Sequence, residues 1–470
     1  MTTRFPRTRI ATAVGGVILM LGASAAFGAA FALQENSGSG LGNAFAGGAA
    51  AAEDASTVWF NPAGMSRIGT NQVASAIHLI GPSAKFSDDG SRAAAQQPLG
   101  GDGGDAGSWA VVPNLYLVVP INRLWAFGIG LNAPFGLVTE YDNTWIGRYQ
   151  AIKSDVRTIN VNPAVSYKID NFTVAAGANY QHIKATFTSK INYSGGLAQA
   201  AAAAAAGGQI PPSAVAPFLA LTTGLDASAN ISGTDDAWGW NVGALWDIST
   251  SSRLGVHYRS SIKYTVTANA EISTPSLPPL PATLAPIGAA LANAVNAQLT
   301  NSGVTAKIEL PPIANLSYFR TLNDRWDVMA DAQWTGWSSI KDLTFVRNNG
   351  TTLSSTPENF KDVWRFSVGA NYRYSDKWMF RGGVAYDQSP VRDEFRTPRL
   401  PDSDRTWLSL GTQYKWSPAL KLDVGATYIL VKDGSINKNG DPPSTASYGL
   451  LKGNYSNDVV IVSGQVTYSF

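Results

Sequence analysis

The sequence predicts an all-β protein: an antiparallel transmembrane β-barrel of about fourteen strands, with an N-terminal hatch in the lumen and helical extracellular loops. Three observations lead to this fold class. Apolar and polar residues alternate with a period of two from Gln72 to the end of the 470-residue chain. Short turns alternate with long connections, and aromatic side chains gather near the strand ends.

The chain begins with the pattern of a secretory signal peptide, which we place at residues 1–28. Three arginines precede an apolar run from Ile10 to Leu21, and residues 26–28 supply small side chains at the usual cleavage spacing. A membrane anchor is the alternative, but the apolar run is short for a spanning helix. Export and the absence of cysteine predict the outer membrane of a Gram-negative bacterium.

Residues 29–70 are predicted to form the hatch. The segment is rich in Gly, Ala and Ser and lacks the periodicity of a long helix or a strand. Its fixed point is the motif Asn61, Pro62 and Ala63, because Pro62 fixes its own φ and pushes Asn61 towards extended geometry. A flexible linker is the alternative. The barrel expected downstream needs a plug, which favours the hatch.

Residues 71–470 are predicted to form the barrel. In the last strand Val460, Val462 and Val466 share one face with Tyr468 and Phe470. A soluble sandwich also alternates, but aromatic residues near the strand ends are typical of a lipid-facing band. The expected strands lie near residues 72–86, 108–119, 123–132, 152–168, 171–192, 232–248, 252–270, 305–321, 325–346, 361–374, 377–389, 403–415, 419–432 and 456–470.

The connections between these strands differ in length. Those around Asp170, Thr250, Asn323, Ser375 and Ser417 have a few residues each. An even strand number with short turns on one side and long loops on the other is typical of outer-membrane barrels. Closure also leaves no unpaired edge in hydrocarbon. The long connections are residues 87–107, 133–151, 193–231, 271–304, 347–360, 390–402 and 433–455.

Two of the long loops are unusually apolar. Residues 195–225 and 277–299 contain Ala-rich stretches that are long enough for helices and are punctuated by prolines. One explanation is that these helices pack on each other and on the barrel rim. The other is an apolar groove that first captures a hydrophobic ligand, and both can hold together.

A break in the wall is predicted in the third strand, at Gly128, Gly130, Pro134 and Gly136. Glycines weaken the ladder, and Pro134 cannot donate a hydrogen bond to it. The alternative is that the strand ends at Asn132 and a loop begins. Leaving an apolar surface for water costs a hydrophobic molecule about 0.8 kcal/mol per methylene, so a sideways exit into the membrane would be favourable.

Five stretches spread along most of the mature chain carry a family resemblance: residues 37–65, 133–149, 159–169, 360–391 and 400–414. Together they resemble the FadL family, outer-membrane transporters of long-chain fatty acids and other hydrophobic compounds. The resemblance implies a barrel with a lumenal hatch, ligand capture between two extracellular loops, an inner pocket, and lateral escape beside a kinked third strand. Transport of aromatic or alkane hydrocarbons in the same fold is the alternative.

The expected substrate-binding residues are Lys361, Arg365, His182 and Lys184. Lys361 and Arg365 share inward parity, and resemblance to the family around residues 360–365 supports Lys361 as a pocket cation. A second family cation lies in a stretch similar to residues 180–184, although His182 and Lys184 have lipid-facing parity unless a bulge intervenes. A carboxylate head group beside such a cation gains a charge-assisted hydrogen bond. The alternative is that lumenal cations only pair with the inward acids Asp331, Asp387 and Asp423.

Other functions lack a signal in the sequence. The charge is balanced, with 35 basic and 33 acidic residues, so we expect no nucleic-acid partner. Without cysteine there is no thiol chemistry, and we expect neither a cofactor nor a metal. His257 has inward parity but lacks the spacing of a nucleophile system, so we expect no enzyme. A general diffusion porin is an alternative, but it needs neither hatch nor apolar loops. We expect a monomer in contact with outer-membrane lipid.

Overall fold

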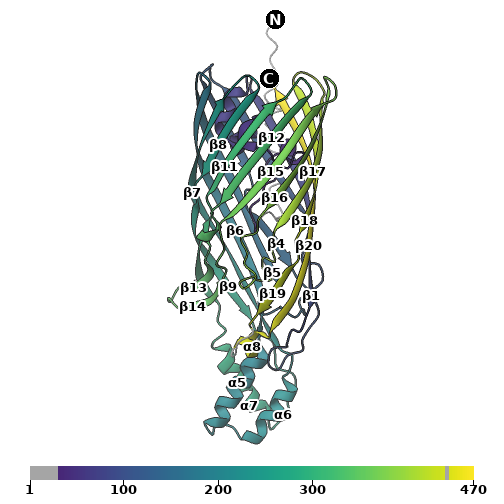
Figure 1. Ribbon diagram of the computed structural model, residues 1–470. Coiled ribbons are helices and arrows are strands. Elements are labelled where there is room, and N and C mark those ends of the chain that lie inside the picture. The colour runs from purple at the N-terminus through teal and green to yellow at the C-terminus, as the bar shows by residue number, and fades with distance from the viewer. Residues whose placement is uncertain (1–29, 440–443) are drawn as a thin grey trace.

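The computed structural model describes residues 30–439 and 444–470. In these residues twenty strand segments form one antiparallel sheet that closes where β1 pairs with β20, giving a 14-strand barrel (Figure 1). The predicted fold class is therefore confirmed. The predicted signal peptide, residues 1–28, lies outside the described residues.

The strand segments outnumber the barrel strands because several strands are interrupted. Among the described residues, β3 continues as β4, β8 as β9, β10 as β11, β12 as β13 and β18 as β19, while β14 forms a side hairpin with β13. The segments are β1 (Gln72–Asp88), β2 (Ala110–Pro120), β3 (Trp125–Asn132), β4 (Gly136–Glu140), β5 (Lys153–Ile169), β6 (Phe172–Asn192), β7 (Asp226–Asp247), β8 (Ser252–Arg259), β9 (Ile262–Ser273), β10 (Ser302–Leu310), β11 (Ile313–Thr321), β12 (Trp326–Thr335), β13 (Asp342–Arg347), β14 (Thr352–Pro357), β15 (Val363–Arg373), β16 (Trp378–Asp387), β17 (Arg405–Lys415), β18 (Leu420–Val431), β19 (Gly434–Lys438) and β20 (Leu451–Ser469).

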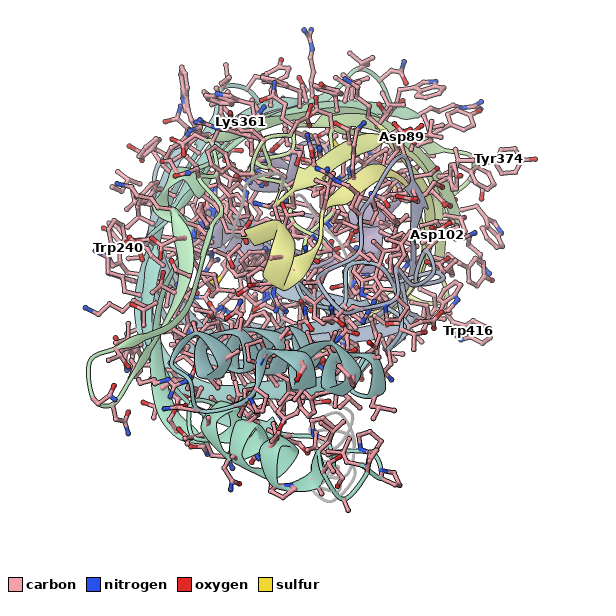
Figure 2. The ribbon with its side chains drawn as sticks, turned by 90° about the horizontal axis from the view of Figure 1, so that it is seen from below. Asp89, Asp102, Trp240, Lys361, Tyr374 and Trp416 are labelled. Carbon is pink, nitrogen blue, oxygen red and sulfur yellow. The ribbon has the colours of Figure 1, made fainter. Side chains whose placement is uncertain are left out.

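The alternation along each strand decides which side chains face lipid. In β15, Arg365 and Ser367 are buried in the lumen, whereas Phe366 and Val368 are 49% and 55% exposed on the outer wall. Aromatic residues ring this wall, and Figure 2 shows Trp240, Tyr374 and Trp416 pointing outward. An apolar outer band with aromatic girdles is the surface that a bilayer requires.

Three of the predicted strands are interrupted in the structure. The segment 252–270 breaks after Arg259, and 305–321 breaks at Pro311 and Pro312, which cannot donate to a ladder. The segment 325–346 turns inward at the 3-10 helix η2 (Trp337–Ser339), which buries Trp337 fully in the lumen. These breaks place irregular backbone inside the barrel, where it is shielded from lipid.

The hatch lies inside the barrel, near the end with the short turns (Figure 1). A Cβ at Gly243 of β7 would come within 2.0 Å of Asn61 Oδ1, and one at Gly255 of β8 within 1.9 Å of the Ala49 carbonyl. Small residues on both sides therefore allow the hatch backbone to lie directly on the wall. Its short helices are α2 (Gly38–Leu41), α3 (Gly48–Ala51), α4 (Thr57–Phe60) and the 3-10 helix η1 (Pro62–Arg67).

The two apolar loops form helices at the opposite end of the barrel (Figure 1). Leu197, Phe218 and Leu291 are buried against one another, so the helices pack together. This packing is the first of the two explanations given for the apolar loops. No helix among the described residues is both long and apolar enough to cross a membrane. The loop helices are α5 (Tyr193–Ala206), α6 (Pro212–Leu221), α7 (Ala285–Asn296) and the short α8 (Ser444–Tyr448).

Candidate functional site

The hatch motif ties two turns of the hatch to the wall. Asn61 has extended backbone, with φ −166° and ψ 104°, as expected before Pro62, which opens η1. Its buried side-chain amide donates to the carbonyls of Ala49 at 2.7 Å and Ala244 at 2.9 Å. Its Oδ1 accepts from the Ala63 amide at 3.1 Å. One asparagine thus joins α3, η1 and strand β7.

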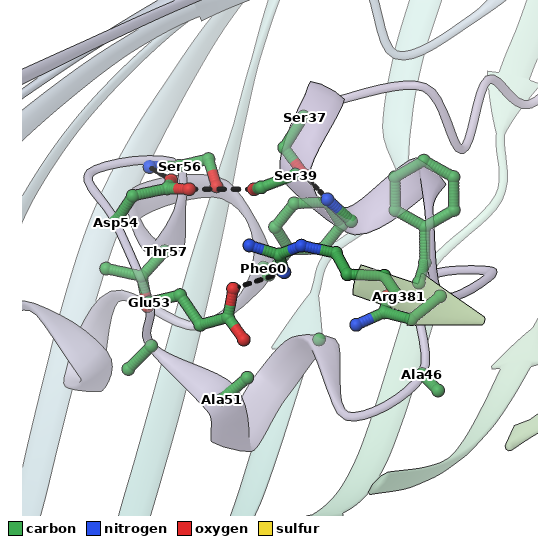
Figure 3. Close-up of a pocket in the computed structure, with 15 residues that line it drawn as sticks. Ser37, Ser39, Ala46, Ala51, Glu53, Asp54, Ser56, Thr57, Phe60 and Arg381 are labelled. Carbon is green, nitrogen blue, oxygen red and sulfur yellow. Dashed lines mark hydrogen bonds and ion pairs between the residues drawn. The ribbon is translucent and has the colours of Figure 1, made fainter. Parts of the chain in front are cut away.

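Charged residues anchor the hatch on its other side (Figure 3). Arg381 of β16 donates to Glu53 at 2.5 Å and to Asp423 of β18 at 3.0 Å, and Asn371 donates to Glu53 at 2.7 Å. Burial alone would raise the pKa of Glu53, but Arg381 and Asn371 hold this pKa below its ordinary value. The cavity beside these residues holds about 40 Å³, which suits ordered water rather than an organic ligand.

The third strand breaks at Ala133–Phe135. β3 pairs with both β2 and β5, whereas β4 resumes after the break and pairs with β5. On the side of β4 that faces β2, the hatch supplies the missing partner. Leu33 N donates to Pro134 O and Gly136 N donates to Phe31 O, each at 2.8 Å. We call Phe31–Leu33 the latch, because its backbone occupies the break.

The structure places two of the four predicted kink residues at this break, Pro134 and Gly136. Gly128 and Gly130 lie within the paired part of β3. A Cβ at Gly128 would come within 2.4 Å of Met65 Sδ in the hatch, and one at Gly130 within 2.9 Å of the Tyr116 ring. These two glycines therefore make room for neighbouring side chains, and the interruption follows from Pro134.

An apolar pocket lies in the lumen beyond the latch. Its volume is about 100 Å³. Small-molecule sites usually hold roughly 300–1,000 Å³, so a long acyl chain needs the latch or a loop to move. The apolar lining is Phe31, Leu137, Val156, Ile183, Phe187, Ile308, Leu310, Ile340, Leu343, Phe360 and Leu400. The polar lining is Lys307, Glu309, Ser339, Asp342, Glu358 and Arg399.

Arg399 is a half-buried cation in this pocket. It comes from the connection between β16 and β17, which folds into the lumen, and its Nη1 donates to Ser154 Oγ at 3.2 Å. Its guanidinium carbon lies 5.2 Å from the centre of the Phe187 ring. Burial lowers the pKa of Arg399 to about 10, against the opposing effect of Glu358. Among the described residues, Arg399 takes part in no ion pair within 4.0 Å.

Glu358 is the acidic neighbour of Arg399. Burial raises the pKa of Glu358 to about 8, although Lys438 and Arg399 act in the opposite direction. At neutral pH the carboxyl is therefore mostly protonated. Glu358 then does not compete for the guanidinium of Arg399, which can bind an anionic head group.

The structure does not bring the four predicted substrate-binding residues together. Lys361 is exposed at the barrel rim (Figure 2), and Arg365 is buried against the hatch, where its Nη2 donates to Ala44 O at 2.8 Å. His182 and Lys184 lie on the outer face of β6, and His182 Nδ1 is 2.9 Å from Asp236 Oδ1. Sequence reasoning did not identify Arg399.

Of the three inward acids, Asp423 forms an ion pair with Arg381, as the alternative of charges that pair within the lumen expects. Asp331 instead accepts a hydrogen bond from the Ser317 hydroxyl, and Asp387 Oδ2 is buried without a hydrogen-bond partner in the described part of the chain. Within residues 30–439 and 444–470, no group of three or more His, Asp or Glu side chains is arranged to hold a metal ion.

Comparisons with known sequences match nearly the whole chain. A family model described as outer membrane protein transport protein (OMPP1/FadL/TodX) matches residues 19–470. The chain is 30% identical over 452 residues to the long-chain fatty acid transport protein of Escherichia coli (strain K12), covering 93% of this chain and 94% of that protein. It is 30% identical over 447 residues to outer membrane protein P1 of Haemophilus influenzae, covering 91% and 90%.

Solved structures agree with the fold. The crystal structure of a Pseudomonas aeruginosa FadL homologue has a TM-score of 0.80 and 26% identity, covering 94% of this chain and 100% of that chain. The Pseudomonas putida toluene transporter TodX has a TM-score of 0.60 and 18% identity, covering 88% and 94%, and this likeness shows the fold alone. The closed barrel, the lumenal hatch and the family match lead to one conclusion: the chain belongs to the FadL family of outer membrane transport proteins.

Proposed function

We propose that the chain carries long-chain fatty acids, or similar hydrophobic molecules, across the outer membrane. The Escherichia coli relative is named a long-chain fatty acid transport protein, which supports this substrate class. The toluene transporter among the structural neighbours supports aromatic hydrocarbons as the alternative. The observation that carries the proposal is an apolar pocket that ends at the latch and is lined by the half-buried cation Arg399.

The route begins at the loop helices and ends at the break in the third strand. α5, α6 and α7 offer apolar surface for capture, and the pocket offers apolar surface within the lumen. Outside the break, Leu79, Val111 and Trp109 are 43%, 44% and 67% exposed. A molecule that leaves there meets membrane hydrocarbon, and it avoids the transfer to water that costs about 0.8 kcal/mol per methylene.

Release requires the latch to leave the break. The Phe31 ring packs 4.9 Å from Trp337 and 5.9 Å from Phe135, and two backbone hydrogen bonds hold the segment. Such bonds contribute about 0.5–1.5 kcal/mol each. Burial of about two to four methylenes, at about 0.8 kcal/mol each, offsets both bonds. The apolar contacts of the Phe31 ring contribute roughly 1.5–3 kcal/mol more, which further buried methylenes of a long acyl chain can replace, so such a chain can displace the latch.

The head group of a fatty acid would lie at Arg399. Lys361 is exposed and Arg365 is engaged with the hatch, whereas the Arg399 guanidinium lines the pocket. A carboxylate beside this cation gains about 1.5–3 kcal/mol from a charge-assisted hydrogen bond. This corresponds to a factor of about ten or more in affinity.

The test compares oleate with an uncharged hydrocarbon of similar length in Arg399→Gln. The glutamine removes the charge but keeps an amide donor, so we expect oleate affinity to fall about tenfold or more while hydrocarbon affinity stays close to that of the wild type. Lys361→Gln, at the exposed rim, is the matched control and should bind both ligands normally. The assignment would be contradicted if Arg399→Gln lost affinity for both ligands in parallel. It would also be contradicted if Lys361→Gln, and not Arg399→Gln, lost affinity for oleate.

A second measurement tests the transport function itself. Wild-type protein that binds toluene but not oleate would favour the aromatic alternative. Binding of neither ligand, together with a steady large ion conductance in planar bilayers, would favour a general diffusion porin.

A further inference from the structure

The apolar pocket reaches the barrel wall at a second place, between β10 and β13. The ladder that joins these strands contains three residue pairs, from Val304–Arg347 to Ala306–Phe345. The same register would next pair Lys307 with Thr344, but the ladder ends before this pair. We call the gap bounded by residues 307–310 and 339–344 the notch. Beside it, β13 and β14 project sideways from the barrel (Figure 1).

The chain around the notch departs from a regular ladder on both sides. The segment after β12 turns inward at η2, and β10 itself ends at Leu310, before Pro311 and Pro312. The backbone that leads into β13 is engaged on its other side, where Phe360 N donates to Ile340 O at 3.1 Å and Glu358 N donates to Lys341 O at 2.9 Å. Across the notch, Ser339 Oγ donates to the Glu309 carbonyl at 2.9 Å, so the two edges are joined there by a side-chain hydrogen bond and not by a backbone ladder.

Residues with both outward and inward parity in β10 line the same pocket. Lys307 and Glu309 have outward parity, and Ile308 and Leu310 have inward parity, yet all four line it. In a continuous sheet, successive side chains lie on opposite faces and cannot share one cavity. The pocket therefore reaches the edge of β10 and the edge of the segment that leads into β13 at the notch.

The surroundings of the notch are polar on the outside and apolar on the inside. Lys307 and Asp342 are exposed, and Glu309 pairs with Lys263 at 3.7 Å on the outer surface. The break in the third strand differs, because exposed Leu79, Val111 and Trp109 flank it. Charged side chains are costly in hydrocarbon, so the notch faces water or lipid head groups and the other break faces acyl chains.

We propose that the notch is the entrance through which a hydrophobic ligand reaches the pocket from the outer, polar side of the membrane. This inference rests on the proposed transport function. The notch adds to the proposed route an opening beside β10, which lies between the loop helices and the latch. An aliphatic chain passes between the polar rim and the inner side chains Ile308, Ile340 and Leu343, and the carboxylate then lies at Arg399.

A disulfide across the notch tests the proposal, because the chain has no native cysteine. In the full-length Lys307→Cys/Thr344→Cys variant, oxidation extends the β10–β13 connection by one residue pair and closes the notch. We expect the association rate of oleate with the purified protein to fall about tenfold or more, as for a closed gate, while the equilibrium affinity is unchanged. Reduction of the disulfide should restore the rate.

The matched control is Thr305→Cys/Val346→Cys, which links a pair already in the ladder and should leave the rate unchanged. If the double variant does not fold, Lys307→Cys labelled after folding with a bulky maleimide should slow association, and labelled Lys184→Cys on the outer wall should not. If oleate associates with the closed or labelled protein at the wild-type rate, the notch is not the entrance. The proposed transport function is unaffected by that result. Failure of the wild type to bind oleate would overturn the transport function itself.

Discussion

Glu358 and Arg399 together set the charge of the pocket. Burial raises the pKa of Glu358 to about 8, so near neutral pH its carboxyl is mostly neutral and Arg399 stays available to an anionic ligand. Above that pH, Glu358 ionises beside Arg399. The new anion then competes for the guanidinium and repels the carboxylate of the ligand.

Oleate affinity should therefore depend on pH. We expect it to be steady around neutral pH and to decrease as the pH rises past about 8, as measured by titration calorimetry. Glu358→Gln, which cannot ionise, should abolish this decrease, and an uncharged hydrocarbon should show none. The same decrease in wild type and Glu358→Gln would assign it to another group.

Folding stability should follow the same ionisation. The pKa of Glu358 in the folded protein lies above the ordinary value of 4.5, so the folded state binds this proton more tightly than the unfolded state. The contribution of Glu358 is therefore fully present below 4.5 and is lost as the pH rises to about 8.

The site was only partly predictable from the sequence, for reasons that depend on the residue. Alternation does indicate that His182 and Lys184 face outward, as they do. Lys361 lies before Val363, where β15 begins, so strand parity does not determine the direction of its side chain. Arg399 lies in a connection, to which no periodicity applies, and its place directly before the family-like stretch 400–414 was the one signal available in the sequence.

At the scale of elements, strand periodicity and turn lengths predicted most of the barrel. The breaks were harder to predict. Pro311 and Pro312 interrupt a strand through chemistry that the sequence displays. Trp337 gives no such signal. A continuous strand over residues 325–346 would point its side chain into the lumen, and in η2 the side chain points into the lumen as well. A local helix that preserves the face of its largest side chain cannot be detected from alternation.

The latch gives a prediction at this scale. Ala32 and Phe135 are partners in an antiparallel bridge, so Ala32→Cys/Phe135→Cys can be joined by a disulfide in a chain without native cysteine. The oxidised protein should bind oleate but not deliver it to the membrane, because the latch then remains in the break. Uptake of labelled oleate by cells, compared with binding by purified protein, measures the two steps separately.

The reduced form of the same variant is the control, since it carries the same substitutions without the link. Uptake should return when the disulfide is reduced. Normal uptake by the oxidised protein would mean that ligand leaves the pocket elsewhere than at Ala133–Phe135.

In the part of the barrel that the structure describes, the notch and the break after β3 have opposite surroundings and lie around one pocket. The polar notch beside β10 suits arrival from outside, and the apolar break after β3 suits departure into hydrocarbon. The hatch occupies the half of the barrel towards the short turns, where Asn61 and Glu53 hold it against β7 and β16. A hydrophobic ligand that displaces the latch can therefore move from one break to the other without crossing the rest of the hatch, from α2 to η1.

Deleting Gly40–Gly64 tests this division between wall and hatch. We expect a folded barrel, because the strand ladders, including the β1–β20 closure, form without hatch residues. The Arg381–Asp423 pair lies within the wall and also remains. Water would fill the part of the lumen that the hatch now occupies. The variant should therefore conduct ions steadily in planar bilayers.

The full-length protein in the same bilayers is the control and should conduct little. Far-UV circular dichroism and heat-dependent gel migration would show that the deletion variant still forms a barrel. The buried contacts of Asn61 and Glu53 lie between the hatch and the wall, so their loss opens the lumen without removing any strand pairing. A folded deletion variant with the conductance of the full-length protein would show that the loops or the latch, and not the hatch, close the lumen to ions.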